Sequence, residues 1–119
     1  MSLARLILFL CVAFGAFFLL KMILIFFRGG IPMADLMALK AAGTKIVDVR
    51  TRAEFEQGHV AGSLNIPLDQ FQARLEEIDL KQPVILCCAS GGRSGMAKQM
   101  LERAGHTQAH NAGAWTTLR

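Results

Sequence analysis

Two adjacent cysteines stand directly before a glycine-rich loop in residues 86–95, LCCASGGRSG. Glycines let backbone N–H groups turn inward, where successive amides can bind an anion. The N-terminus of a following helix would add partial positive charge to the same place. A cysteine in such surroundings has a lowered pKa and is a thiolate near neutral pH. The stretch therefore predicts an activated thiol that faces an anion-binding loop.

The position of each cysteine in a strand predicts which thiol is activated. The apolar run at residues 83–88 is typical of a strand buried on both faces of a parallel sheet. Neighbouring strand side chains point to opposite faces, so Cys87 is expected to pack in the core and Cys88 to open the loop as the nucleophile. The residues expected to bind the substrate are those that follow Cys88: Ala89, Ser90, Gly91, Gly92, Arg93 and Ser94.

Strand and helix patterns alternate along the chain after residue 30. Strands are predicted at residues 45–49, 63–67, 83–88 and, more weakly, 107–111. Helices are predicted at residues 33–43, 51–58, 68–78 and 94–105, with a last turn at 113–119. Thr51 and Glu54 form a capping box at the start of the second helix, and Ser94 is expected to cap the last one. This alternation predicts an α/β domain with a mostly parallel sheet, whose sites lie beyond the carboxyl ends of the strands.

A few further polar residues are candidates for roles at that edge. Asp48 and Arg50 end the strand at residues 45–49 and form a possible rim of the site, where they either brace the loop and steer substrate or make a structural ion pair. His59 lies in a glycine-flanked turn, which favours a structural hydrogen bond over a general base. The cysteines and histidines lack the spacing of a metal site, so neither a metal nor a cofactor is expected.

The N-terminal segment is apolar enough to enter a membrane. Residues 6–27 contain one charge, Lys21, and as a helix would be about 33 Å long, against about 30 Å for a bilayer core. We therefore expect a single-pass anchor at residues 1–28 that contacts membrane lipid through residues 6–27, followed by a domain at 29–119. A cleavable signal peptide is the first alternative, although a polar segment and a small-x-small cleavage site are missing. A helix buried in the core is the second.

Charge and cysteine content limit the partners and the compartment. The formal net charge is +4, of which Arg5, Lys21 and Arg28 supply +3 within residues 1–28. The remainder has ten basic and nine acidic residues and no basic run, which argues against a nucleic-acid partner. Cys87 and Cys88 are too close for an unstrained disulfide. The charges that flank the apolar segment barely differ between its two ends, so they do not decide the orientation. The absence of a disulfide framework then favours the cytoplasmic face of the membrane.

Three blocks of this sequence, in order, resemble a single-domain rhodanese. They are DVRTRAEFEQGHVAGSLNIPLDQF, VILCCASGGRSGMAKQMLERAG and NAGAW, and the likeness covers about residues 30–119. The family's Cys-x-x-Gly-x-Arg-Ser loop falls on Cys88, Gly91, Arg93 and Ser94. The resemblance implies a three-layer α/β/α domain with a mostly parallel five-stranded sheet. It also implies a sulfurtransferase that moves sulfane sulfur from thiosulfate or a persulfide donor to a thiol, a protein cysteine or cyanide, through a persulfide on Cys88.

Two other functions compete with this interpretation. Phosphatases and arsenate reductases of related fold use a longer Cys-x5-Arg loop, whereas Cys88 and Arg93 make Cys-x4-Arg. A non-catalytic, membrane-tethered binding module would not need the thiol, the glycines and the arginine together. The chain stops four residues after Trp115, so the last helix of the family is expected to be clipped or absent.

Overall fold

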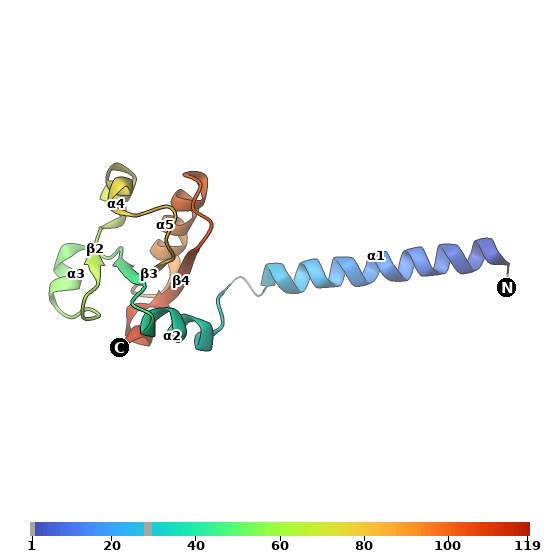
Figure 1. Ribbon diagram of the computed structural model, residues 1–119, viewed down its shortest axis with the longest axis horizontal. Coiled ribbons are helices and arrows are strands. Elements are labelled where there is room, and N and C mark those ends of the chain that lie inside the picture. The colour runs from blue at the N-terminus through green and yellow to red at the C-terminus, as the bar shows by residue number, and fades with distance from the viewer. Residues whose placement is uncertain (1, 28–29) are drawn as a thin grey trace.

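The computed structural model describes residues 2–27 and 30–119 (Figure 1). The expected boundary between anchor and domain falls on residues 28 and 29, which lie outside the described residues. The described chain consists of one long N-terminal helix followed by an α/β domain.

The domain is built on a parallel sheet with the strand order β2-β1-β3-β4. Its strands are β1 (Lys45–Asp48), β2 (Leu64–Asn65), β3 (Val84–Cys88) and β4 (Ala109–Ala114). The sheet thus has four strands within the described residues rather than the five that the resemblance implied. Strand β4 ends three residues later than predicted, because its pairing with β3 resumes after an irregularity and joins Cys88 to Ala114.

Helices cover both faces of the sheet, which gives the expected three layers. They are α2 (Met33–Ala41), α3 (Arg52–Glu56), α4 (Leu68–Phe71), η1 (Gln72–Glu77), α5 (Gly92–Arg103) and η2 (Trp115–Leu118). One core cluster joins alternate residues of β3 to Phe71 and Leu101, and the other joins the intervening residues to Leu36 and Leu118. The single helix predicted at residues 68–78 is wrong: Arg74 has non-helical φ −118° and ψ 20°, and a 3-10 helix replaces its second half.

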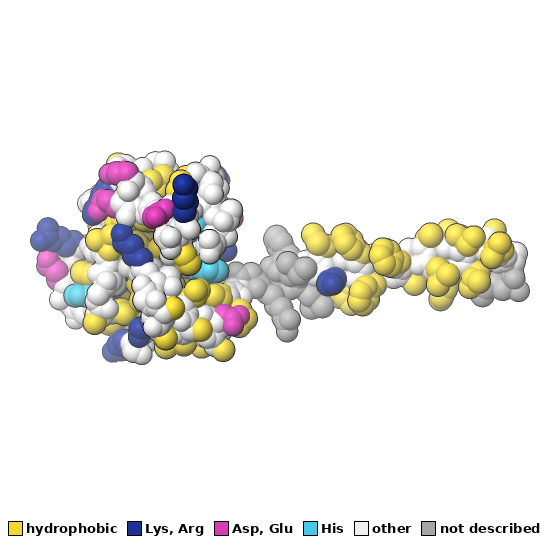
Figure 2. All heavy atoms as spheres, viewed as in Figure 1, with side chains coloured by type: hydrophobic (Ala, Val, Ile, Leu, Met, Phe, Trp, Pro, Cys, Tyr) yellow, Lys and Arg dark blue, Asp and Glu magenta, His cyan; other side chains and the backbone are white. Residues whose placement is uncertain are grey.

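The N-terminal helix α1 (Leu3–Phe27) is long and apolar enough to cross a membrane. Within the span Leu3–Ile23, an 18-residue window reaches a mean hydropathy of 2.6, and none of that window is buried. Figure 2 shows apolar side chains along this helix, and Figure 1 shows it extending away from the domain. The alternative of a buried core helix is therefore wrong.

Candidate active site

The two adjacent cysteines belong to opposite faces of the sheet. Cys88 packs in the cluster that contains α5, whereas Cys87 packs in the cluster that contains α2. Both residues are buried, with 0% of Cys87 and 1% of Cys88 exposed. Burial, followed by the charge of Asp48, raises the pKa of Cys87 to about 12. Cys87 is therefore a neutral thiol at physiological pH, as expected of a core residue.

The sulfur of Cys88 is surrounded by hydrogen-bond donors of the loop that follows β3. The Gly91 amide donates to Sγ at 2.9 Å, and the Ser94 hydroxyl lies 3.3 Å from the same atom. Burial by itself raises the pKa of Cys88, but the Ser94 hydroxyl and the amides of Ser94, Ser90 and Gly91 together lower it to about 7. The thiolate of Cys88 is therefore accessible near neutral pH.

Gly91 shapes this loop through a backbone conformation that other residues rarely adopt. It is the N-cap of α5 and has φ 107°. A Cβ at this position would lie 3.2 Å from the Cα of Gly113. The helix consequently begins at Gly92, two residues earlier than predicted, and the expectation that Ser94 caps it is wrong. Ser94 lies inside the first turn, where its buried hydroxyl turns towards Cys88 instead of towards the helix amides.

Asn111 holds the loop in place, a role that the sequence did not indicate. Its Oδ1 lies 2.7 Å from the Ser94 hydroxyl and accepts from the Gly113 amide at 2.9 Å. Its Nδ2 donates to the Gly91 carbonyl at 3.0 Å. A single asparagine thus orients both the N-cap of α5 and the serine beside Cys88. Only the parallel pairing of β4 with β3 brings it there.

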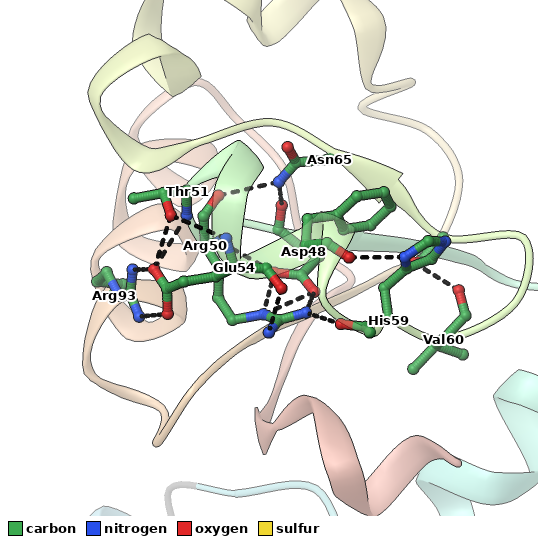
Figure 3. Close-up of polar contacts among 11 residues, drawn as sticks. Asp48, Arg50, Thr51, Glu54, His59, Val60, Asn65 and Arg93 are labelled. Carbon is green, nitrogen blue, oxygen red and sulfur yellow. Dashed lines mark hydrogen bonds and ion pairs between the residues drawn. The ribbon is translucent and has the colours of Figure 1, made fainter.

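Arg93 reaches across to α3 and forms an ion pair with Glu54 (Figure 3). Its Nη1 and Nη2 donate to Oε1 and Oε2 of Glu54 at 2.7 and 3.0 Å. The hydrogen bond to Arg93 is the main cause that lowers the pKa of Glu54 to about 2. Glu54 was predicted only as part of a capping box, which is confirmed, since it also binds the Thr51 amide and hydroxyl. Its contact with the loop arginine was missed.

Asp48 and Arg50 form a buried ion pair next to this site (Figure 3). The Arg50 side chain donates three hydrogen bonds of 2.8–3.0 Å to the Asp48 carboxylate and one of 2.7 Å to the Gly58 carbonyl. Its guanidinium also lies 4.6 Å from the ring centre of Trp115. Asp48 is 0% and Arg50 4% exposed, so this geometry favours a structural ion pair over a role in steering substrate. The pair ties β1 to the segment that carries α3.

The remaining loop residues lie nearer the surface. Ala89, Ser90 and Gly92 are exposed, which leaves the outer side of the loop open to solvent. His59 uses Nδ1 to contact the Phe55 carbonyl at 2.8 Å and stacks on the Phe55 ring, in keeping with a structural role in its turn. Within residues 2–27 and 30–119, no three metal-binding side chains come together.

A cavity of about 370 Å³ lies beside the loop and is called the Arg93 cavity below. Its walls are mainly apolar, and its charged residues are Arg93 and Asp69. The lining residues are Val49, Thr51, Pro67, Leu68, Asp69 and Arg93.

Comparisons with known proteins agree with this geometry. The family model described as "Rhodanese-like domain" matches residues 33–116. The chain is 34% identical over 91 residues to the thiosulfate sulfurtransferase PspE of Escherichia coli, covering 74% of this chain and 88% of that protein. It is 45% identical over 67 residues to the uncharacterized protein YqhL of Bacillus subtilis, covering 56% of this chain and 53%, about half, of that relative. The human single-domain sulfurtransferase TSTD1 superposes with a TM-score of 0.69 at 27% identity, covering 76% of this chain and 95% of that one.

Proposed function

This chain belongs to the rhodanese-like domain family, and on that premise we propose that it is a sulfurtransferase in which Cys88 carries the transferred sulfur. The observation that carries the proposal is the position of the Cys88 sulfur, which accepts a hydrogen bond from the Gly91 amide and lies 3.3 Å from the Ser94 hydroxyl. These donors favour the thiolate, which is the nucleophilic form of the side chain.

In the first step, the Cys88 thiolate attacks the outer sulfur of thiosulfate or of a persulfide. With thiosulfate, a bond forms between Sγ and the outer sulfur, the S–S bond of the donor breaks, and its electron pair leaves with sulfite. The cysteine is then a persulfide anion, so the charges balance. The loop from Ala89 to Ser94 binds the anionic donor, chiefly through its amides and the N-terminus of α5, and Arg93 adds a positive charge to this loop.

In the second step, an acceptor removes the outer sulfur. A thiolate or cyanide attacks that sulfur, the bond to Sγ breaks, and the Cys88 thiolate is restored while a persulfide or thiocyanate departs. This is covalent catalysis in two half-reactions, with the enzyme alternating between two forms. A small thiol or an exposed cysteine of another protein is the natural acceptor for such chemistry.

We further propose that α1 anchors the domain to a membrane, with the domain on the cytoplasmic face. The support is the apolar stretch Leu3–Ile23, which is unburied and of sufficient length. The domain's thiol chemistry suits a reducing compartment. Membrane fractions should contain the full-length chain after alkaline washing. Protease added to the outer side of spheroplasts should leave the domain intact, and digestion of the domain there would reverse the orientation.

The proposed reaction is tested by intact mass after incubation of the full-length chain with thiosulfate. We expect the mass of one sulfur atom to be added at Cys88 and removed again by cyanide. Cys88→Ser should abolish both the added mass and thiosulfate–cyanide turnover. Cys87→Ser is the matched control, since it alters the neighbouring buried thiol, and it should retain turnover. Turnover by folded Cys88→Ser would refute the role of Cys88.

A further inference from the structure

The loop arginine is bound by a carboxylate from another element of the fold. Both terminal nitrogens of Arg93 donate to the two carboxylate oxygens of Glu54, an arrangement that fixes the orientation of the guanidinium. Glu54 is itself held at the first turn of α3, where it accepts from the Thr51 amide and hydroxyl at 3.2 and 3.1 Å. The ion pair is therefore anchored at its acidic end, and Arg93 is drawn towards α3 (Figure 3).

Arg93 directly precedes the residue that contacts the reactive thiol, since the Ser94 hydroxyl lies 3.3 Å from Cys88 Sγ. The hydrogen bond with Glu54 is the main cause that raises the pKa of Arg93, and the charge of Cys88 contributes in the same direction. An anion bound by the loop at Cys88 therefore lies on the same loop as Arg93, whose charge is paired with Glu54. Asp69, which lines the same cavity as Arg93, adds a second acid. Arg93 and Glu54 together carry no net charge, so the arginine lacks the positive excess that would attract a dianion.

We propose that Glu54 is a specificity-determining residue that offsets the charge of Arg93. The site then selects sulfur donors of low negative charge, namely persulfides of small thiols, over dianionic thiosulfate. The selection rests on the proposed sulfur transfer, but the electrostatic effect of Glu54 on the thiol does not.

The first test measures charge selectivity at Cys88 without any sulfur transfer. Iodoacetate and iodoacetamide have similar size and differ by one negative charge, and each loses iodide to the attacking thiolate. Both rates are measured on full-length protein in nonionic detergent at high pH, with Cys88 modification quantified by peptide mass spectrometry. The ratio of the two rates cancels differences in folded fraction and in thiolate fraction. Glu54→Gln should raise the iodoacetate/iodoacetamide ratio roughly two- to fivefold, as for a partly exposed charge pair.

Glu54→Gln is a gentle substitution because glutamine also serves in the capping box. The matched control is Glu56→Gln, which removes the same charge from the same helix, where Glu56 pairs with the exposed Arg52. This control should leave the ratio unchanged. The double variant Glu54→Gln/Arg93→Gln should fall back towards the original ratio, because the gain requires the released charge of Arg93. Raising the salt concentration should shrink the effect.

The second test uses two sulfur donors, thiosulfate and the hydropersulfide of 2-mercaptoethanol. With the latter, the Cys88 thiolate bonds to the outer sulfur and 2-mercaptoethanol leaves as its thiolate, so Cys88 becomes a hydropersulfide. Glu54→Gln should increase kcat/KM for thiosulfate roughly 4- to 25-fold, since the Coulomb energy scales with the donor's charge. For the hydropersulfide the change should stay below about twofold.

The outcomes separate this inference from the proposed function. An unchanged alkylation ratio in Glu54→Gln, or an equal change in Glu56→Gln, would overturn the inference whatever the donor kinetics. A raised alkylation ratio without sulfur loading from either donor would support the role of Glu54 in charge selection and refute the sulfurtransferase. Equal gains for both donors would refute selection by donor charge.

Discussion

Ser94→Ala should raise the pKa of Cys88 by about one unit, from about 7 to about 8. The substitution removes the buried hydroxyl that lies 3.3 Å from Sγ. A hydrogen bond to a charged group contributes about 1.5–3 kcal/mol. The Ser94 hydroxyl has only one proton, which it shares between the Cys88 sulfur and Asn111 Oδ1, 2.7 Å away, so its contribution at the sulfur is smaller. We therefore take roughly 1–2 kcal/mol for the loss, and about 1.4 kcal/mol corresponds to one pKa unit. Asn111 keeps its bond from the Gly113 amide, so the loop should retain its shape.

The assay is the pH profile of iodoacetamide modification at Cys88. The folded-state pKa is lowered, so thiolate is lost as pH falls through about 7 in the parent and through about 8 in the variant. A more basic thiolate is intrinsically faster by about threefold per unit, so the variant should be slower at pH 6 and faster at pH 10. Ser90→Ala is the control, because it removes the same atom from an exposed loop residue and keeps the amide. An unshifted midpoint in folded Ser94→Ala would show that the amides alone stabilise the thiolate.

Three further substitutions test the surroundings of the site. Cys87→Ala should retain thiosulfate–cyanide turnover and should lower the free energy of unfolding, measured by urea denaturation, by about 1 kcal/mol, because it truncates a small buried side chain. Loss of turnover in the folded variant would contradict the assignment of Cys87 as a core residue. Arg50→Leu should destabilise the domain by about 3–5 kcal/mol in the same assay, since it leaves Asp48 buried without its charge partner; a stability near that of the parent would contradict this. Gly91→Ala should destabilise the domain by about 1–3 kcal/mol, because φ of 107° strains any residue with a Cβ. It should also raise the pH midpoint of Cys88 alkylation by displacing the amide donor, and an unshifted midpoint would refute that role of the Gly91 amide.

The sequence was most informative where local rules and tertiary packing agree. The continuous apolar run predicted β3 to within one residue, because a strand buried on both faces needs apolar side chains throughout. The Thr51–Glu54 capping box was also confirmed, since its two hydrogen bonds depend only on residues three apart. The same locality explains why the alternation of strands and helices was enough to identify the class of fold.

Residues placed by contacts between distant segments were less predictable. Glu54 and Arg93 are 39 positions apart, and Ser94 and Asn111 are 17 apart, so no short motif contains either pair. The start of α5 was misplaced because serine at position 94 satisfied the capping rule, whereas Gly91 provides the left-handed turn that actually begins the helix. A glycine pair in a loop gives no indication of which glycine takes the positive φ.

The register of β3 decides which of two adjacent thiols can be reactive. A slip by one residue would exchange the faces of every side chain in the strand, and with them the two cysteines. Pairing on both sides opposes such a slip, since Asp48 of β1 lies opposite Cys87 and Ala114 of β4 lies opposite Cys88. In this register burial, followed by the carboxylate of Asp48, disfavours a thiolate on Cys87, while Ser94 and the loop amides favour one on Cys88. The chemical difference between two identical side chains therefore arises from strand pairing, and a variant that weakens the pairing of β3 should lose the selectivity of alkylation between them before it loses the fold.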